Sequence, residues 1–502
     1  MKISDLLRFT AARAPEADAL RFEDRSFTYR ELYADVCRLA NGLRRIAAPG
    51  DRVAILAENH PEYVMAYYGV PLAGMALTFV NYRLGAREIA AILGDARPAV
   101  VIVEEKYLDK VPDGVTRVVI DADVPGTTPF ADLLDAPDDE PDADDTALAW
   151  LIYTSGTTGM PKGAMLSHRN VVAAVLNAGV AWERTGDRAV SLMPWPLCHI
   201  AGYGVLVNHL HAATLVLMRR YDPVRFLADI ERHGVTDITA APTMLSMLLR
   251  SPEIAERDTS TIRRVGYGAA PMPVEVLRRA MKQFPNARFQ TGFGMTELAG
   301  NVMVHTADDH IAAVEGRTEL LASIGKPMPL SAVRIVGPDG NDVAAGEVGE
   351  FCIRGEQVAM AYWERPDATA GSFRDGWFHS GDLAKRDEEG YFYIVDRLKD
   401  MILTGGENVY SREVEDVLYA HPSVAEAAVV GEPDEEWGER VVAVIQPVSG
   451  ARPTEDEIIA FCKDRLAGFK RPRRVVYVDE LPRNAAGKIL KRELRTLLHS
   501  NA

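Results

Sequence analysis

The most informative stretch of the sequence reads YTSGTTGMPKG and runs from Tyr153 to Gly163. Hydroxyl side chains packed between glycines, with one lysine, are typical of a loop that surrounds phosphate oxygens with backbone N–H groups and hydroxyls. A Walker P-loop is one alternative, but it ends in Gly-Lys-Ser/Thr, whereas Lys162 lies between Pro161 and Gly163. A flexible turn is the other, and five hydroxyl residues with a lysine in so short a loop argue against it. The stretch therefore predicts a phosphate-binding loop.

Short apolar runs around this loop alternate with helical patterns. Asp51–Leu56 predicts a strand, followed by a helix that begins near His60. Val100–Val103 and Arg117–Ile120 are further β-branched runs, and shorter strands with more turns follow Gly325. This alternation predicts parallel sheets with helices on their faces. We therefore predict an α/β fold, with a large N-terminal body of several subdomains with parallel sheets flanked by helices, and a small mobile α+β C-terminal domain.

The composition is that of an ordinary globular protein. The 502 residues are 47% hydrophobic and 25% charged, which excludes collagen-like and wholly disordered chains. At roughly 100–200 residues per domain, the length predicts about three domain-sized units. The chain has 56 basic and 72 acidic residues, a net charge of −16, which argues against nucleic acid as a partner.

The cysteines and the long apolar stretches bear on the location of the protein. Four scattered cysteines form neither a disulfide framework nor a CxxC metal motif, and they fit a reducing cytoplasm. Tyr63–Tyr82 is long enough to span a bilayer, which takes roughly 20 apolar residues. However, glycines and a proline interrupt it, and Ala189–Met218 contains three histidines and two prolines. We expect both stretches to be core elements, each with a helix and a strand, and no transmembrane span.

A change in charge marks the C-terminal region. Residues 400–462 contain 3 basic and 14 acidic residues, whereas residues 463–495 contain 11 basic and 4 acidic residues. A locally basic segment on an acidic protein is either a solvated face or a surface that approaches phosphates. The hinge is expected at Asp396–Lys399, directly after the aromatic strand Tyr391–Val395. The predicted domains are therefore residues 1–396, which bind acid and ATP, and residues 397–502, which carry a catalytic lysine.

Three further segments carry candidate binding groups. Gly292–Glu297 combines an aromatic ring, a hydroxyl and a carboxylate on one glycine-framed turn, so Phe293 could stack on a base while Glu297 holds Mg²⁺; a helix cap is the alternative. Asp382 could accept hydrogen bonds from both ribose hydroxyls, although a turn is its commoner use. A proline-to-glycine loop ending at Lys488 presents a cation, which without the other motifs would be an ordinary surface lysine.

Taken together, these motifs resemble those of the adenylate-forming enzymes, which include acyl-CoA synthetases, aryl-CoA ligases, luciferases and peptide-synthetase adenylation domains. The resemblance runs from about Ser4 to Leu498 and is strongest to fatty-acyl-CoA synthetases. Two positions depart from the family pattern, which usually has tyrosine at Phe293 and commonly has proline at Ser411. Phe293 can still stack, and Ser411 is interpreted as a local variation of a turn.

The resemblance assigns roles to individual residues. Those implied in nucleotide binding are Thr154, Ser155, Gly156, Thr157, Thr158, Lys162, Gly268, Ala269, Ala270, Pro271, Gly292, Phe293, Gly294, Met295, Thr296, Asp382, Ile394, Arg397 and Lys488. Those implied in catalysis are Lys488, Lys162, Thr296 and His199, with Thr154 and Glu297 at Mg²⁺. Gly405, Gly406 and Glu407 would line the coenzyme A tunnel, and Lys399 would be the hinge. The acyl pocket would be formed by His199, Ile200, Gly204, Val205, Gly268, Gly292, Met295 and Gly300.

The implied reaction is ATP-dependent activation of an apolar, fatty acid to acyl-AMP, followed by transfer to coenzyme A. The residues of the predicted acyl pocket include no carboxylate that could pair with the α-amino group of an amino acid. They also include no cation that could pair with the second carboxylate of a dicarboxylic acid. Three alternatives stay open: an aryl-CoA ligase of the coumarate or benzoate type, an enzyme that loads a carrier protein, and a silent nucleotide-binding homologue. The expected partners are a small carboxylic acid, ATP, Mg²⁺ and coenzyme A. A homodimer is also left open.

Overall fold

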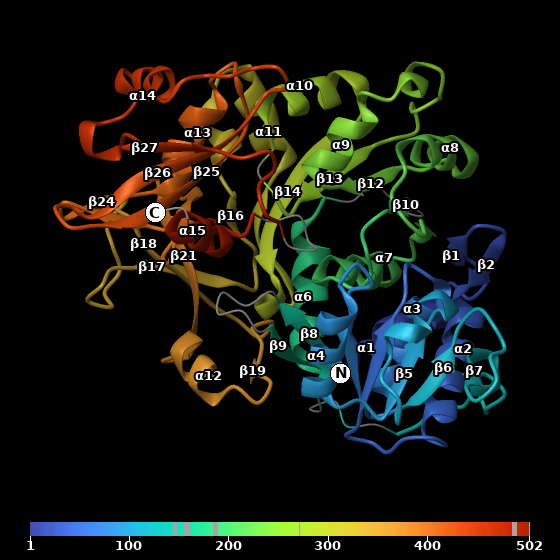
Figure 1. The fold of residues 1–502 in the computed structure, drawn as a ribbon. Coiled ribbons are helices and arrows are strands. Elements are labelled where there is room, and N and C mark those ends of the chain that lie inside the picture. The colour runs from blue at the N-terminus through green and yellow to red at the C-terminus, as the bar shows by residue number, and fades with distance from the viewer. Residues whose placement is uncertain are drawn as a thin grey trace. The chain divides into compact units, whose positions relative to one another are not determined.

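The computed structural model divides into two compact units (Figure 1). The first comprises Met1–Val333 and Ile353–Phe378, and the second comprises Arg334–Cys352 and His379–Ala502. The structure describes residues 1–142, 144, 148–154, 161–183, 189–270, 272–483 and 489–500. The division of the chain at residue 396, which concerns movement of the C-terminal part, stays a prediction.

The first unit contains an eight-stranded sheet in the order β19-β9-β8-β4-β3-β5-β6-β7 among the described residues. The strands β3 to β8 are mutually parallel, and β9 and β19 are antiparallel to their neighbours. The bounds are β3 (Arg52–Leu56), β4 (Ala76–Phe79), β5 (Val100–Val103), β6 (Thr116–Val119), β7 (Thr128–Pro129), β8 (Leu148–Thr154), β9 (Lys162–Ser167) and β19 (Ala361–Tyr362). The runs of β-branched residues thus form the centre of a buried parallel sheet, as predicted.

A nine-stranded sheet in the order β16-β15-β14-β13-β12-β10-β11-β1-β2 lies in the same unit. From β1 to β14 its central strands are parallel, and β2, β15 and β16 are antiparallel. The bounds are β1 (Asp18–Phe22), β2 (Arg25–Thr28), β10 (Val190–Met193), β11 (Thr214–Leu217), β12 (Asp237–Ala240), β13 (Arg264–Gly268), β14 (Arg288–Met295), β15 (Gly300–His305) and β16 (Lys326–Pro327).

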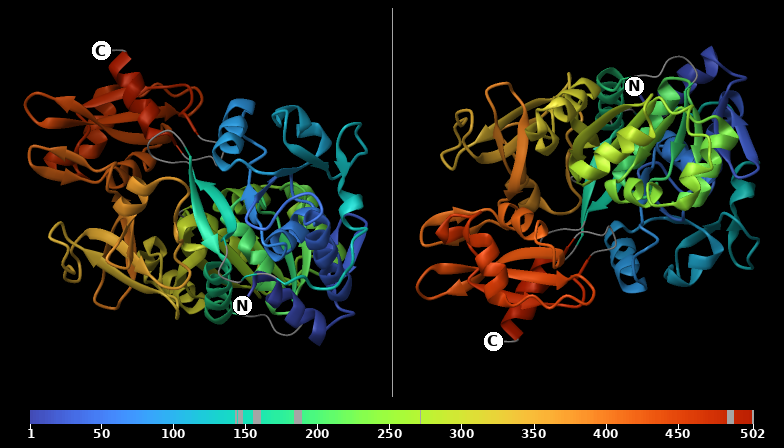
Figure 2. Two further views of the ribbon diagram at one scale, coloured as in Figure 1. Left: turned by 90° about the horizontal axis from the view of Figure 1, so that it is seen from below. Right: turned by 90° about the horizontal axis from the view of Figure 1, so that it is seen from above.

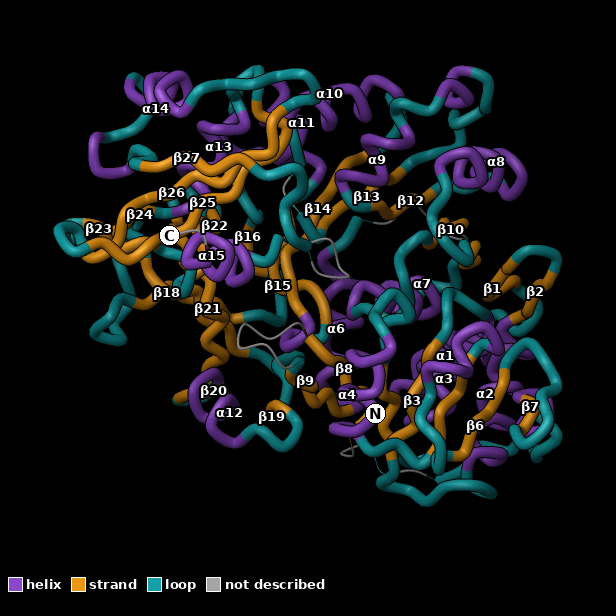
Figure 3. Tube along the Cα trace, in the orientation of Figure 1, coloured by secondary structure: helices purple, strands orange, loops and turns teal. Residues whose placement is uncertain are grey.

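Helices connect and cover these two sheets (Figure 3). The longer ones are α1 (Ile3–Arg13), α2 (Tyr29–Leu43), α3 (Pro61–Leu72), α4 (Ala86–Ala96), α6 (His168–Ala181), α7 (Gly204–Leu210), α8 (Pro223–His233), α9 (Pro242–Leu248), α10 (Val274–Gln283), α11 (Ala307–Glu315) and α12 (Pro366–Ser372). The short ones are η1 (Glu105–Lys110), α5 (Phe130–Leu133), η2 (Ile200–Tyr203), η3 (Pro252–Ala255), η4 (Thr296–Leu298) and η5 (Thr318–Ala322).

The two long apolar stretches are core elements, as expected. Tyr63–Tyr82 contains most of α3, in which every residue is buried, and then β4. Ala189–Met218 contains β10, η2, α7 and β11. No helix among the described residues combines the length and apolarity needed to cross a bilayer.

The second unit contains two smaller sheets. One has the order β17-β18-β21-β20 with β22 beside β21, and the division between the units passes through its strands. The bounds are β17 (Ala332–Val336), β18 (Gly349–Arg354), β20 (Phe373–Arg374), β21 (Trp377–Arg386) and β22 (Phe392–Arg397). The other has the order β24-β23-β26-β25 with β27 beside β26. Its bounds are β23 (Ile402–Thr404), β24 (Glu407–Val409), β25 (Val424–Asp434), β26 (Gly438–Pro447) and β27 (Arg474–Tyr477).

This last sheet buries both of its faces because successive side chains of a strand point to opposite sides. Ala427 and Val429 of β25 join a core with α13 (Ser411–Tyr419) and α14 (Glu455–Lys463). Ala428 and Val430 instead join a core with α15 (Lys491–Ser500), which lies against the strands in both views of Figure 2. The short η6 (Gly468–Lys470) precedes β27. The predicted α/β fold class with a smaller C-terminal α+β part is confirmed.

Candidate functional site

The candidate residues of the first unit lie where parallel strands end. Thr154 is the last residue of β8, Gly268 the last of β13, and Met295 the last of β14. In open α/β sheets, ligands bind outside the carboxyl ends of the strands, because the loops that follow converge there. The alternation of strands and helices, which is visible in the sequence, therefore places motifs more than 100 residues apart at comparable positions.

Thr154 and Lys162 form the base of the predicted phosphate loop. They are register partners where β8 and β9 pair antiparallel, and the Thr154 hydroxyl donates a hydrogen bond to the Lys162 carbonyl at 3.4 Å. Asp95 braces this base, because its carboxylate accepts hydrogen bonds from Tyr153 at 2.7 Å and from Arg365 at 2.6 Å. The predicted phosphate ligands Ser155, Gly156, Thr157 and Thr158 lie outside the described residues.

Tyr362 connects the phosphate-loop lysine to the predicted magnesium ligand. The Lys162 ammonium lies 5.2 Å from the centroid of the Tyr362 ring, within the range of a cation–π interaction. The Tyr362 hydroxyl donates a hydrogen bond of 2.9 Å to the Glu297 carboxylate. Sequence analysis missed Tyr362, and the one signal for it was an aromatic pair, Tyr362-Trp363, directly before a charged turn.

The donor set at this point suits Mg²⁺. Mg²⁺ is a hard cation that takes oxygen ligands and keeps several water molecules. Glu297 offers a half-buried carboxylate, and Thr154 offers a hydroxyl on the strand that pairs with Lys162. Glu297 is held in place through its own backbone, since its carbonyl accepts a hydrogen bond from the Ala359 N–H at 2.8 Å. The resemblance assigns Mg²⁺ to these two residues, where it would neutralise phosphate charge, and this assignment stays a prediction.

The segment that contains Phe293 is a strand end, and the prediction of a turn there was wrong. Residues 292–295 belong to β14 and pair with β15, with a register shift between Phe293 and Gly294. The shift requires glycine, because a Cβ atom on Gly294 would lie 2.0 Å from the Gly300 carbonyl oxygen. Thr296 and Glu297 then start η4. The irregularity is a local change of register, after which Met295 still pairs with Gly300.

The loop assigned to the adenine side follows β13. Gly268 and Gly292 are register partners, so two neighbouring strand positions lack side chains. Ala269 takes a left-handed conformation with φ of 68°, and Ala269 and Ala270 are exposed. Pro271 lies outside the described residues. The backbone at this edge is thus open to a flat ligand, and the assignment of this loop to a nucleobase stays a prediction.

The residues of the predicted acyl pocket come from η2 and α7 on one side and from the strands β13, β14 and β15 on the other. Tyr203, the last residue of η2, lies over Gly300 so closely that a Cβ atom there would meet its ring at 2.8 Å. Gly300 in turn is the register partner of Met295. Ile200 belongs to η2 beside His199, and Gly204 and Val205 open α7. Their assignment to a pocket stays a prediction, to which the structure adds the Tyr203 ring.

In the second unit, Asp382 and Arg397 form a partly buried ion pair. They are register partners of β21 and β22, and Arg397 Nε lies 2.6 Å from Asp382 Oδ1. Hydrogen bonds to β18 hold the preceding residues: Ser380 donates to the Phe351 carbonyl at 2.7 Å, and Gly381 N–H donates to Glu350 at 3.2 Å. The pairing brings together the two residues that the resemblance assigns to the ribose, and Ile394 lies on the same strand as Arg397.

Ser411 is buried and bonded, so its interpretation as a local variation of a turn was wrong. Its N–H and hydroxyl both donate to the buried Asp396 carboxylate. The Lys491 ammonium donates to the Ser411 hydroxyl and pairs with Glu415 at 2.7 Å. A proline at position 411 could supply neither bond of Ser411. This network, Asp396–Ser411–Lys491–Glu415, adjoins the predicted hinge.

The remaining predicted residues of this unit are Gly405, Gly406, Glu407, Lys399 and Lys488. Gly405 and Gly406 form the tight turn between β23 and β24, with φ of 59° and 84°, values that glycine adopts without strain. Glu407 is exposed beside them. Lys399 is also exposed, and desolvation lowers its pKa against the opposing effect of Asp400. Lys488 lies outside the described residues, and its role stays a prediction.

Known proteins match this chain over nearly its whole length. The family model of the AMP-binding enzyme matches residues 7–363, and that of the AMP-binding enzyme C-terminal domain matches residues 413–488. A feruloyl-CoA synthase of Amycolatopsis is 41% identical over 97% of this chain and 96% of its own length. A long-chain-fatty-acid–CoA ligase of Mycobacterium tuberculosis is 34% identical over 98% of this chain and 97% of its own.

Solved structures agree in fold. The o-succinylbenzoate-CoA synthetase of Bacillus subtilis, in complex with its acyl-adenylate intermediate, superposes with a TM-score of 0.86 at 32% identity. The match covers 98% of this chain and 97% of that one. The same enzyme has been solved with ATP and a magnesium ion. The chain belongs to the AMP-binding enzyme family and is an adenylate-forming acid–thiol ligase that uses ATP, Mg²⁺ and coenzyme A.

Proposed function

We propose that the enzyme converts an aromatic carboxylic acid of the hydroxycinnamate class to its coenzyme A thioester. The acid carboxylate attacks the α-phosphate of ATP, forming acyl-AMP and releasing pyrophosphate. The coenzyme A thiol then attacks the acyl carbon, loses its proton, and releases AMP. The similarity to a feruloyl-CoA synthase over 97% of the chain supports this choice. It departs from the fatty acid favoured by the sequence analysis.

The observation that carries the proposal is the position of Asn301. Its side-chain amide nitrogen lies where a side chain of Gly292 would begin, 2.3 Å from the position of that Cβ atom. Among the described residues, none accepts a hydrogen bond from this amide. The glycine pair Gly268 and Gly292 offers a flat wall, and Asn301 offers a polar group at that wall. A planar ring can lie against the flat wall, and its hydroxyl needs the polar group, because a buried hydroxyl without a hydrogen-bond partner is unfavourable.

In this proposal, residues of the first unit bind and orient the reactants. Lys162 and the hydroxyls of its loop would contact the phosphates, and Thr296 would bond the α-phosphate side. His199 would orient the acid carboxylate next to the pocket.

Lys488 would approach during adenylation and offset the charge that develops as two anions meet. Rotation of residues 397–502 about Lys399 would then bring Gly405, Gly406 and Glu407 to the coenzyme A thiol.

A fatty acid is the second candidate, favoured by the apolar character of the predicted pocket. Ile200, Val205 and Met295 offer apolar side chains, and Tyr203 adds a buried ring. Each extra methylene buried there would contribute about 0.8 kcal/mol. Specificity would then rise with chain length until the pocket is full.

The deciding experiment is kcat/KM with ferulate, coumarate, cinnamate and the fatty acids from acetate to palmitate, at saturating ATP and coenzyme A. We expect ferulate or coumarate to exceed every fatty acid, and Asn301→Leu to reduce the advantage of coumarate over cinnamate about tenfold. Asn41→Leu, a change of the same kind on α2, serves as the control. A preference for decanoate or a longer acid would favour the second candidate.

Three further points stay proposals. Loading of a carrier protein would be a second use of the acyl-AMP beside transfer to coenzyme A, since a fatty acid–carrier-protein ligase of Streptomyces coeruleorubidus is 35% identical; an assay with each acceptor tests this. A cytoplasmic location would fit four cysteines that are all buried and form no disulfide among the described residues. Light scattering would decide between a monomer and a homodimer.

A further inference from the structure

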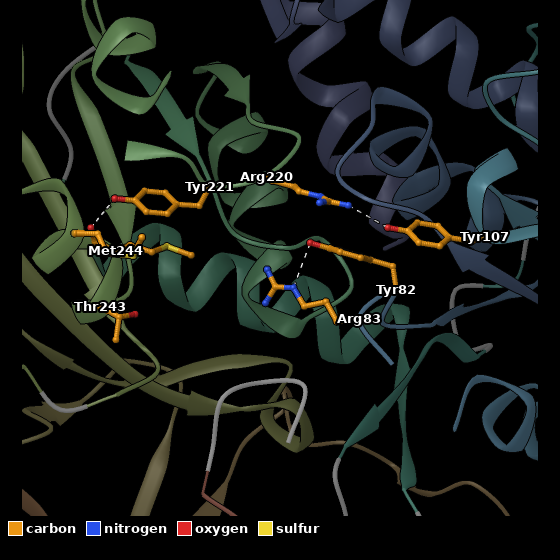
Figure 4. Close-up of a pocket in the computed structure, with 8 residues that line it drawn as sticks. Tyr82, Arg83, Tyr107, Arg220, Tyr221, Thr243 and Met244 are labelled. Carbon is orange, nitrogen blue, oxygen red and sulfur yellow. Dashed lines mark hydrogen bonds between the residues drawn. The ribbon is translucent and has the colours of Figure 1, made fainter. Parts of the chain in front are cut away.

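A cavity of about 540 Å³ lies in the first unit, and none of the residues assigned above lines it. It lies beyond the ends of four parallel strands. Tyr82 and Arg83 follow β4, Tyr107 belongs to η1 after β5, Arg220 and Tyr221 follow β11, and Thr243, Met244 and Met247 belong to α9 after β12. Figure 4 shows the residues from the two sheets facing one another across a common space. The carboxyl ends of parallel strands are where such sheets bind ligands, and the volume suits a small molecule.

The lining of this cavity is aromatic, apolar and cationic. Three tyrosines and two methionines provide ring faces and thioethers, and none of the described lining residues is acidic. Tyr82 and Tyr107 are stacked with their ring centroids 5.9 Å apart. Arg83 donates a hydrogen bond of 3.3 Å to the Tyr82 hydroxyl and lies over its ring, with 5.4 Å between the guanidinium carbon and the centroid. An aromatic surface with a guanidinium group at its edge matches an aromatic acid.

Buried acids next to the cavity offset part of the positive charge around it. Glu58 and Glu104 are both 1% exposed. Glu58 pairs with Arg220 and accepts a hydrogen bond of 3.0 Å from Tyr107, while Lys106 lies 2.9 Å from it. Glu104 pairs with Arg219 at 2.9 Å.

Arg220 is therefore largely neutralised by Glu58, whereas Arg83 has no carboxylate partner among the described residues. A polyphosphate would need more free charge than this.

The cavity adjoins the segment that leads to the predicted acyl pocket. Cys198, the residue before His199, is buried, and its pKa is raised to about 12 by desolvation, with the charge of Arg83 as the main opposing influence. Asn59 fixes this segment, because its amide donates to the carbonyls of Trp195 and Met218 and accepts from Leu197 N–H, each at 2.8 Å. The segment thus lies in a bonded position beside the cavity.

We propose that this cavity is a second binding site for an aromatic monocarboxylate, separate from the acyl pocket and next to the segment that carries His199. The choice of an aromatic acid rests on the proposed function. Arg83 binds the carboxylate, and the stacked tyrosines with Met244 contact the ring. The acid is held there without reacting, so no bond forms or breaks.

The test separates this site from the catalytic one. The full-length enzyme is first saturated with cinnamoyl-sulfamoyl-adenosine, a stable analogue of the acyl-adenylate, and cinnamate is then titrated into the complex by isothermal titration calorimetry. We expect one molecule of cinnamate to bind per chain. Arg83→Gln should weaken this binding about fivefold, and Met247→Glu, which adds an anion at an exposed position of the lining, should abolish it. Arg87→Gln removes the same charge four residues away and should bind as the wild type does.

The titrations distinguish the existence of the second site, the class of its ligand and the proposed function. Absence of cinnamate binding to the saturated enzyme, or equal affinity in Arg83→Gln and wild type, overturns the second site. Binding of decanoate in preference to cinnamate, or of ATP or coenzyme A at this site in preference to both acids, overturns the ligand class. Failure of the adenylate analogue to bind, with Arg83-dependent cinnamate binding retained, contradicts the proposed function while supporting the cavity.

Discussion

The two units place their candidate residues by different physical means. In the first unit, strand ends and glycines form the site: Gly268 and Gly292 lack side chains, and Gly294 permits a register shift that no larger residue allows. In the second unit, paired polar groups hold the candidate residues in place: Asp382 pairs with Arg397, and Asp396 accepts a hydrogen bond from Ser411. Substitutions should therefore act through steric overlap in the first unit and through electrostatics in the second.

The largest expected effect is electrostatic. Lys488→Ala should reduce acyl-AMP formation about 10²–10³-fold, because one cation that stabilises developing charge is lost. Formation of the thioester from supplied acyl-AMP should stay nearly normal, since no second anion meets the phosphate in that step. Separate assays of the two half-reactions measure this. Equal losses in both would show that Lys488 does not act in adenylation alone.

The steric side of the comparison is tested by two glycines of the first unit. Gly294→Ala would place a Cβ atom 2.0 Å from the Gly300 oxygen and 2.6 Å from Asn301 Cα, so backbone must shift. We expect a loss of about 3 kcal/mol in the free energy of unfolding, with a loss of adenylation.

Gly94→Ala is the matched control for this change. Gly94 is exposed in the last turn of α4, with nothing within 4 Å of the added atom. Alanine there should stabilise the protein by about 0.5–1 kcal/mol, because it loses less conformational freedom on folding. Urea unfolding of both variants measures the difference. If the two alanines behaved alike, steric overlap would not be what determines the β14–β15 pairing.

Two substitutions at Ser411 test how much each hydrogen bond of the network in the second unit contributes to stability. Ser411→Ala keeps the N–H bond to Asp396 but loses the hydroxyl bonds to Asp396 and Lys491, and should destabilise the protein by about 1 kcal/mol. Ser411→Pro loses the N–H bond as well, and should destabilise it by about 2 kcal/mol. Thermal unfolding of both variants tests this order. A proline variant as stable as wild type would mean that Asp396 finds another donor.

The smallest effect is a pH dependence of the first unit. His209 is fully buried; it accepts a hydrogen bond from Tyr68 at 2.8 Å and donates one to the Ala19 carbonyl at 3.2 Å, and burial lowers its pKa to about 4. Because the folded pKa lies below the unfolded value, the unfolded chain binds the proton first as the pH falls. Stability should therefore decrease below about pH 6.5, by about 1 kcal/mol at pH 5.5, and level off below pH 4.

His209→Gln isolates this contribution, since glutamine carries both a donor and an acceptor but does not titrate. Urea unfolding at pH 7.5 and 5.5 should show a smaller loss in the variant than in wild type. The same loss in both would assign the acid sensitivity to other groups, such as His305, whose pKa burial also lowers to about 4.

Much of the fold was predictable because local patterns and global topology agree. Val100–Val103 is a strand with the predicted bounds, and the strand predicted at Asp51–Leu56 begins one residue later, at Arg52. The prediction for Gly292–Glu297 was wrong in structure, since glycines that suggest a turn instead permit a bulge beside Gly300. Ser411 was misjudged for a similar reason: its bonds join residues 15 and 80 positions apart in sequence.

The sequence by itself determined the alternating strands and helices, the motif predicted to bind phosphate and the membership of the family, because these depend on residue type and on spacing along one segment. The tertiary structure alone decided which side chains meet. Tyr362 lies between Lys162 and Glu297, Asn301 lies at the face of Gly292, and the cavity collects residues from the ends of four strands. These neighbours come from segments far apart in the chain, and only strand order and register bring them together.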